Sequence, residues 1–154
     1  MYIPEIPNNS LTNEINQITR LAVLLEGNIR FEFNKPATES EIEDLENYFN
    51  ITLPQSYKDW LSFSNGSIID GDYVVLFSIS EIKKLQIKSF PNDYIIIGTV
   101  IGDGEVLCIS KTTQKFIRCF EGEERVYDSL NDFFKRPLKS MLLNAEEILG
   151  KIEI

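Results

Sequence analysis

Ser80 and Lys83 are separated by two residues, the spacing at which a lysine can assist a serine nucleophile in penicillin-interacting enzymes. The Ser-Asp-Asn and Lys-Thr-Gly motifs that complete such sites are absent from the sequence. Ser80 also lies near the expected start of a short helix, where a hydroxyl group acts as a cap. We therefore expect capping, and not nucleophilic catalysis, at Ser80.

Asp103 and Glu105 flank Gly104 and place two carboxylates within one turn. Two carboxylates could contribute to a site for a hard cation, but a calcium-binding loop supplies six or more oxygen ligands at set spacings. Glycine and aspartate are also the residues that turns favour. A tight turn between two strands is the better explanation, and we expect no metal here.

The 154-residue chain contains no histidine and only two cysteines. Histidine is the most frequent general base and a frequent metal ligand, so triads that depend on it are excluded. Two thiols are too few for a four-thiolate zinc site. Because no secretory signal is present, Cys108 and Cys119 are predicted to be reduced, partly buried thiols on neighbouring strands. The sequence therefore predicts a protein without catalytic residues, cofactor or metal.

The charge of the chain is strongly negative. It has 15 lysines and arginines against 24 acidic residues, a formal net charge of −9 and a pI near 4.6. Such a surface repels phosphate backbones and anionic lipid headgroups, which argues against nucleic acid and membrane as partners. It favours a basic protein. Residues 31–50 carry six acidic residues against one lysine, so more than half of the net charge falls there.

Two segments are candidate partner-binding sites. The first is the acidic helix expected at residues 38–50, with Glu39, Glu43, Asp44 and Glu46. The alternative for this helix is a solvated face whose acids match the positive end of the helix dipole. The second is the loop Asp70-Gly71-Asp72-Tyr73, in which a tyrosine beside two carboxylates would suit an arginine-rich partner. The alternative for this loop is a plain connection into the next strand.

The pattern of apolar residues predicts the elements that position these segments. Helices are expected at residues 11–25, 38–50, 54–64 and 78–85, and from residue 129 to 149 with a break or kink at Pro137. Capping boxes are expected at Thr38 with Glu41 and at Ser78 with Glu81. Strands are expected at residues 73–77, 94–100, 105–110 and 115–120, after a short extended segment at 29–33 and before a last short strand at Val126 and Tyr127. Trp60 and the aromatic residues around it are expected in the core.

These elements predict an α+β fold, in which helices pack on a mainly antiparallel central sheet. A single domain over residues 1–154 is expected, with a loose lead at 1–9 and a C-terminal helical extension at 138–154. The start of the chain lacks the features of a signal peptide, and the apolar stretch at 94–101 is too short to cross a bilayer. The expected location is the cytoplasm. An exposed sheet edge could pair two copies, so a monomer or a weak homodimer is expected.

Several motifs together resemble a known family. They are the run Pro36-Ala37-Thr38-Glu39, Leu53-Pro54, Tyr57, Trp60-Leu61 and Ser64-Asn65-Gly66. This order resembles the signature of the SUKH superfamily, the SMI/KNR-type domains, over residues 33–134. The sequence departs from that family at Cys108-Ile109-Ser110, where many relatives carry an aspartate, and after Pro137.

The resemblance implies a non-catalytic binding fold. It implies a bacterial immunity protein that binds and neutralises a cognate polymorphic toxin of nuclease or deaminase type. A regulatory or small-molecule-binding module on the same fold is the alternative that it also allows.

Overall fold

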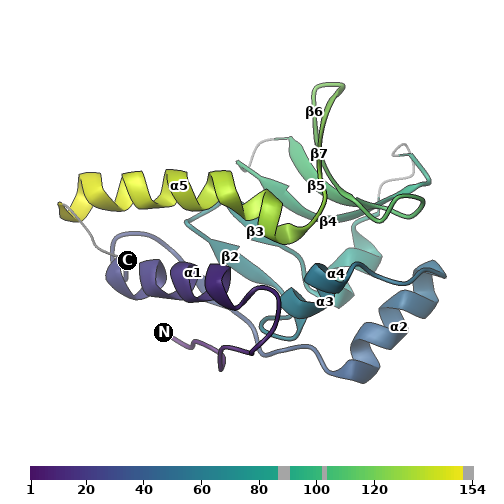
Figure 1. Cartoon of the computed structure of the whole chain (residues 1–154), viewed down its shortest axis with the longest axis horizontal. Coiled ribbons are helices and arrows are strands. Elements are labelled where there is room, and N and C mark those ends of the chain that lie inside the picture. The colour runs from purple at the N-terminus through teal and green to yellow at the C-terminus, as the bar shows by residue number, and fades with distance from the viewer. Residues whose placement is uncertain (87–90, 102–103, 151–154) are drawn as a thin grey trace.

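The computed structural model describes residues 1–86, 91–101 and 104–150 of the chain. Within these residues, one antiparallel sheet of seven strands follows the order of the sequence, so each strand pairs with the next (Figure 1). The strands are β1 (Glu32–Phe33), β2 (Ser67–Ile69), β3 (Val74–Leu76), β4 (Tyr94–Val100), β5 (Glu105–Ser110), β6 (Phe116–Phe120) and β7 (Glu123–Tyr127). The predicted α+β class with a mainly antiparallel sheet is confirmed.

The helices of the described residues are α1 (Thr12–Leu24), α2 (Glu39–Phe49), α3 (Gln55–Leu61), α4 (Ile79–Lys84) and α5 (Leu130–Leu149). Both predicted capping boxes are present. In the first, the Glu41 amide donates to Oγ1 of Thr38 at 3.1 Å and the Thr38 amide donates to Oε1 of Glu41 at 3.0 Å. Ser78 and Glu81 form the second box at the start of α4. These local bonds satisfy amide groups that have no partner within a helix.

Pro137 lies inside α5 and does not end the helix, although the sequence predicted a break or kink there. Proline removes one backbone donor from the helix, and packing of its ring against the core can offset that loss. Pro137 is buried on the same side of α5 as Phe133 and Met141. Residues 138–149 therefore continue the helix that begins at Leu130.

Three strands differ from the expectation. Strand β2 was not predicted, because its three residues are too few for an alternating pattern. Only Val126 and Tyr127 were expected as a strand, but β7 begins at Glu123 and four of its five residues are exposed. The extended segment expected at 29–33 contributes only two residues to the sheet. The turn expected at Gly102 and Asp103 lies outside the described residues.

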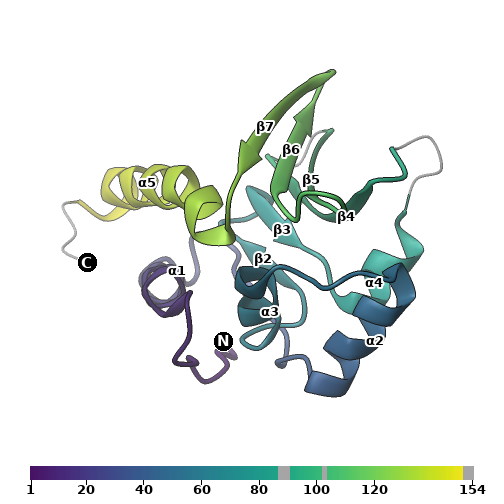
Figure 2. The ribbon, with the colours of Figure 1, turned by 45° about the vertical axis from the view of Figure 1, so that its right-hand side comes forward.

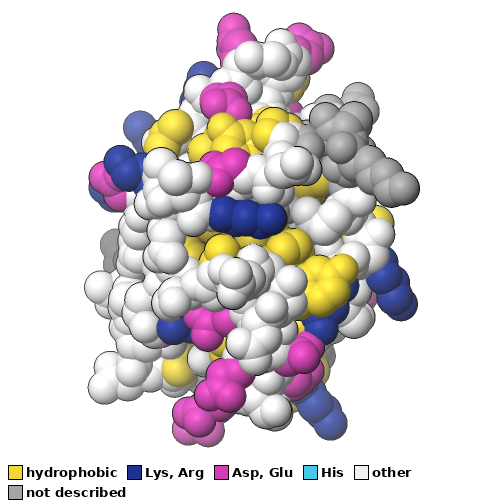
Figure 3. All heavy atoms as spheres, turned by 90° about the vertical axis from the view of Figure 1, so that its right-hand side faces the viewer, with side chains coloured by type: hydrophobic (Ala, Val, Ile, Leu, Met, Phe, Trp, Pro, Cys, Tyr) yellow, Lys and Arg dark blue, Asp and Glu magenta, His cyan; other side chains and the backbone are white. Residues whose placement is uncertain are grey.

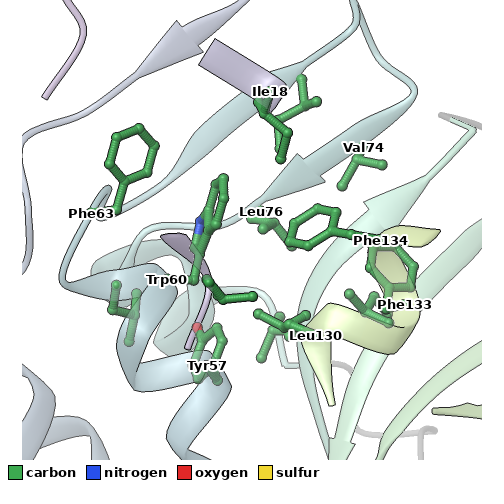
Figure 4. Packing of buried hydrophobic residues seen from close by; sticks show 14 of the residues in the cluster. Ile18, Tyr57, Trp60, Phe63, Val74, Leu76, Leu130, Phe133 and Phe134 are labelled. Atoms are coloured by element: carbon green, nitrogen blue, oxygen red, sulfur yellow. The ribbon is translucent and has the colours of Figure 1, made fainter. Parts of the chain in front are cut away.

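The core lies against the sheet, and helices α1 to α5 all contribute buried side chains to it. Trp60 of α3 is fully buried, and its ring centroid lies 5.4 Å from that of Phe63 and 5.3 Å from that of Phe134 of α5 (Figure 4). The expectation that Trp60 belongs to the core is confirmed. In Figure 2, α1 and α5 lie together at one end of the molecule, while α2 and α4 lie at the other.

Candidate partner-binding surface

Helix α2 holds its acidic residues in two different settings. Glu39 and Glu43 are four residues apart, so they lie one above the other on the same side of the helix. Both are exposed, and neither forms an ion pair with another described residue. The capping box fixes the start of the helix and thereby the direction in which Glu39 projects. These two carboxylates are available to a partner.

Asp44 and Glu46 are engaged within the fold. Asp44 forms an ion pair with Lys83 of α4. Glu46 accepts a hydrogen bond from the amide of Leu53 at 2.7 Å, and Nζ of Lys58 lies 3.7 Å from the same oxygen. The side chain of Glu46 is only 20% exposed. The predicted set of four acids therefore contains two that hold α2 against its neighbours.

Tyr48 adds an aromatic side chain to the exposed side of α2. It is 56% exposed, and Nζ of Lys83 lies 5.2 Å from its ring centroid. Figure 3 faces this end of the molecule, where acidic side chains gather below a band of hydrophobic ones. The sequence analysis did not single out Tyr48. Ile42, Leu45 and Phe49 form the apolar stripe of this helix. Tyr48 lies outside that stripe, and this position could have identified it as an exposed aromatic residue.

The second candidate segment forms the turn between β2 and β3. The Tyr73 amide donates to the carbonyl of Asp70 at 3.2 Å, and Asp70 adopts a left-handed backbone with φ of 56°. Asp72 is exposed, and Tyr73 is half-buried against the core. Asp70 is only 9% exposed, and burial raises the pKa of its carboxyl above the usual value. The two carboxylates of this turn therefore sit in unlike environments.

A cavity of about 490 Å³ adjoins this turn and reaches the side of α5. Arg118 of β6 contributes to its wall and is 8% exposed. The Nη2 atom of Arg118 donates to both carboxylate oxygens of Glu105, at 3.2 and 2.9 Å. This pairing gives Glu105 a structural role within the sheet. Asp103, the other carboxylate considered there, lies outside the described residues.

The structure does not bring the two predicted segments together. The cavity beside Asp70 is walled by α5, whereas α2 packs against α4. Figures 1 and 2 both place α2 and α5 at opposite ends of the molecule. Any partner that contacts both would have to cover much of one side of the protein.

The remaining candidate nucleophiles have structural surroundings. Ser78, not Ser80, caps α4, so the capping role expected for Ser80 was wrong; the Ser80 side chain is exposed in the first turn of α4. Cys108 is buried on β5 and Cys119 is half-buried on the neighbouring β6, both as free thiols, as predicted. Burial raises the pKa of both thiols, which lowers the fraction of reactive thiolate.

The described part of the chain contains no cluster of three or more cysteine or carboxylate side chains placed to hold a metal ion. Across the same residues, none of the helices combines the length and the apolar character needed to cross a bilayer.

Comparison with known proteins adds two findings. The model of the SMI1 / KNR4 family (SUKH-1) matches residues 36–136, which is more than half of the chain. The match begins just before the capping box of α2 and ends within α5. The uncharacterized protein YnaB of Bacillus subtilis (strain 168) is 32% identical over 68 residues, which are 44% of this chain and 47% of YnaB. The chain thus spans about half the length of this curated relative.

Proposed function

The chain belongs to the SMI1/KNR4 (SUKH-1) family, and from this membership we propose that it is an immunity protein that binds and neutralises a cognate bacterial toxin. The resemblance to toxin-neutralising members suggests a toxin of the nuclease or deaminase type. A toxin that acts on nucleic acid needs a basic surface to hold its substrate. An acidic binding protein is physically suited to cover such a surface.

The observation that carries this proposal is the pair Glu39 and Glu43 on α2. Both carboxylates are exposed and without an ion pair among the described residues, although Asp44 and Glu46 on the same helix have one. Like charges four residues apart on a helix repel each other, and this repulsion opposes the favourable effect of the helix dipole on acids near its N-terminus. Their presence is explained if they face the positive charges of a partner.

Neutralisation in this proposal is a binding event and not a reaction. The immunity protein covers the substrate-binding surface of the toxin, and long-range attraction between the acidic helix and the basic toxin speeds their encounter. The absence of histidine and the raised thiol pKa values of Cys108 and Cys119 favour such a role over catalysis. We propose that the protein acts in the cytoplasm, where it meets the toxin, as a monomer or a weak homodimer.

A second candidate function is a regulatory or small-molecule-binding module on the same fold. The observation that favours it is the cavity beside Asp70, whose volume of about 490 Å³ falls within the range of small-molecule sites. The two candidate functions predict different genes next to the coding sequence of this protein. An immunity protein is expected directly downstream of a large toxin with a variable C-terminal domain.

The experiment takes the C-terminal domain of the protein encoded directly upstream. That domain is expressed in a susceptible bacterium with and without this protein, and binding of the two purified proteins is measured by calorimetry. The proposal predicts restored growth and a stoichiometric complex. A growth defect that persists with this protein present, together with no heat of binding, would contradict it.

A further inference from the structure

Asp70 lines the cavity beside α5, and one of its carboxylate oxygens is buried without a hydrogen-bond donor among the described residues. Asp70 is 9% exposed, and its Oδ1 atom has no hydrogen-bond partner among the described residues. The cavity lies between the turn that holds Asp70, Asp72 and Tyr73 and the side of α5 that presents Arg136 and Asn144. Leaving such a group buried and unpaired destabilises the folded state, and more so when the group is charged. The fold therefore gains nothing from this oxygen.

The turn itself does not need the carboxylate. Its conformation is held by backbone groups, because the Tyr73 amide donates to the carbonyl of Asp70 and the Gly71 amide donates to the carbonyl of Arg30 at 2.8 Å. The left-handed backbone at Asp70 suits asparagine as well as aspartate. Neither the turn nor the backbone conformation accounts for a negative charge at this position.

The basic groups nearest to the cavity leave this charge unbalanced. Arg118 lies in the wall but is committed to Glu105 through two hydrogen bonds. Within the described residues, neither Asp70 nor Asp72 forms an ion pair with a basic side chain. Apart from the paired Arg118, the charged residues that line the cavity are Asp70, Asp72 and the exposed Arg136. The cavity lining thus has one negative charge in excess, and Asp70 has a carboxylate oxygen that lacks a hydrogen-bond donor.

We propose that this cavity accepts the guanidinium group of one arginine side chain of the partner protein, with Asp70 as its principal ligand. This inference rests on the proposed function, because it assigns the arginine to the toxin. A guanidinium group brings five donors and a positive charge, which match a buried carboxylate and a second carboxylate at the rim. The half-buried Tyr73 and the 54% exposed Ile101 offer an apolar wall for the side-chain stem.

The test uses the whole chain and a simple probe. Arginine blocked at both ends, as the N-acetyl amide, is titrated into the ¹⁵N-labelled protein and followed by NMR. The equally blocked citrulline has the same shape without the charge and is the matched control. We expect saturable shifts of the amides of Gly71, Asp72, Tyr73 and Asn144, with a dissociation constant in the millimolar range, because one buried ion pair supplies the affinity.

Two variants then assign the binding to Asp70. Asp70→Asn keeps the shape of the side chain and should weaken binding of blocked arginine by about tenfold or more. Glu5→Gln removes an exposed carboxylate and should leave the affinity unchanged. Equal shifts with blocked citrulline, or unchanged affinity in Asp70→Asn, would overturn the proposal. Each spectrum also reports whether the variant remains folded.

Two further results separate this proposal from others. Agmatine carries the same guanidinium group on a small free amine, and much tighter binding of agmatine than of blocked arginine would overturn the assignment to a protein side chain.

Failure of the cavity assignment can also be distinguished from failure of the proposed function. If blocked arginine binds but the upstream protein does not, the immunity function is wrong, and so is the assignment of the arginine to a toxin. If the toxin binds but blocked arginine does not, only the assignment of the cavity is wrong.

Discussion

Glu105 and Arg118 form a buried ion pair that links β5 to β6 diagonally across the sheet. Both carboxylate oxygens accept hydrogen bonds from Nη2 of Arg118, at 3.2 and 2.9 Å, and each residue is 8% exposed. Arg118 lies opposite Leu107, two residues from Glu105 along β5. A pair this far from solvent has a large desolvation cost, so each charge depends on the other.

Removing one member of this pair should destabilise the fold strongly. Glu105→Met leaves the guanidinium of Arg118 buried without its partner and is expected to lower the free energy of unfolding by about 3–5 kcal/mol. The double variant Glu105→Met/Arg118→Met removes both charges and should recover much of that loss. Urea unfolding followed by the fluorescence of Trp60, the single tryptophan, measures both variants. A double variant less stable than Glu105→Met would contradict this account.

Glu46 should matter for stability more than Glu43 does. Glu46 accepts a hydrogen bond from the Leu53 amide at 2.7 Å and lies near Lys58, while Glu43 is exposed. A hydrogen bond to a charged group contributes about 1.5–3 kcal/mol, so Glu46→Ala should lower the free energy of unfolding by about that much. Glu43→Ala should change it by no more than about 0.5 kcal/mol. Equal effects of the two changes in urea unfolding would refute the distinction.

Tyr57 carries a buried hydroxyl group that the fold does not use. The side chain is 1% exposed, and its oxygen has no hydrogen-bond partner among the described residues. Burial raises the pKa of Tyr57, so the group stays neutral. Tyr57→Phe removes only the unpaired hydroxyl and should leave the free energy of unfolding equal or raise it by about 1 kcal/mol. A loss of more than 1 kcal/mol would mean that the hydroxyl has a partner, such as a bound water.

Asp70→Asn should stabilise the protein at neutral pH. Burial raises the pKa of Asp70 in the folded state, and a carboxyl with a raised pKa opposes folding when it is ionised. Its contribution is favourable below the unfolded-state pKa of about 3.9 and is lost as pH rises through the folded-state pKa. The variant should therefore unfold at a higher temperature than the wild type at pH 7, with a smaller difference near pH 4. Asp72→Asn, at an exposed position, is the control, and a less stable Asp70→Asn at pH 7 would contradict the argument.

Local sequence signals predicted the helices well. The capping boxes at Thr38 and Ser78 depend on residues three positions apart, so the sequence contains everything that they need. The meander of β4 to β6 followed from alternating apolar strands separated by turns. Strands β2 and β7 were missed or shortened because pairing with a neighbouring strand defines them, and their own residues carry little pattern.

The candidate site was only partly predictable for the same reason. That Glu46 is held by Leu53 and Lys58 depends on how α3 packs beside α2. That Asp70 lines a cavity depends on α5 and β6, which lie far along the chain and contribute the other side of its wall. Residue type and spacing located the carboxylates, but only the packing of distant elements decides which of them are free.

The central claim is that α2 steers a basic partner onto the protein. Charge reversal at Glu39 and Glu43 should act mainly on the association rate, because attraction between separated charges precedes contact and is screened over about 8 Å at physiological ionic strength. Reversal at Asp44 and Glu46 should add a loss of stability, since these residues hold α2 in place. The informative variant is therefore Glu39→Lys/Glu43→Lys.

The most direct measurement is the association rate of the cognate toxin with the wild type and with this double variant, at low and at high salt. Circular dichroism first confirms that the variant is folded. We predict that the variant associates about tenfold or more slowly at low salt and that the difference narrows at high salt. Equal association rates of wild type and variant at low salt would contradict the account, because the acidic face of α2 would then be a solvated surface with no part in binding.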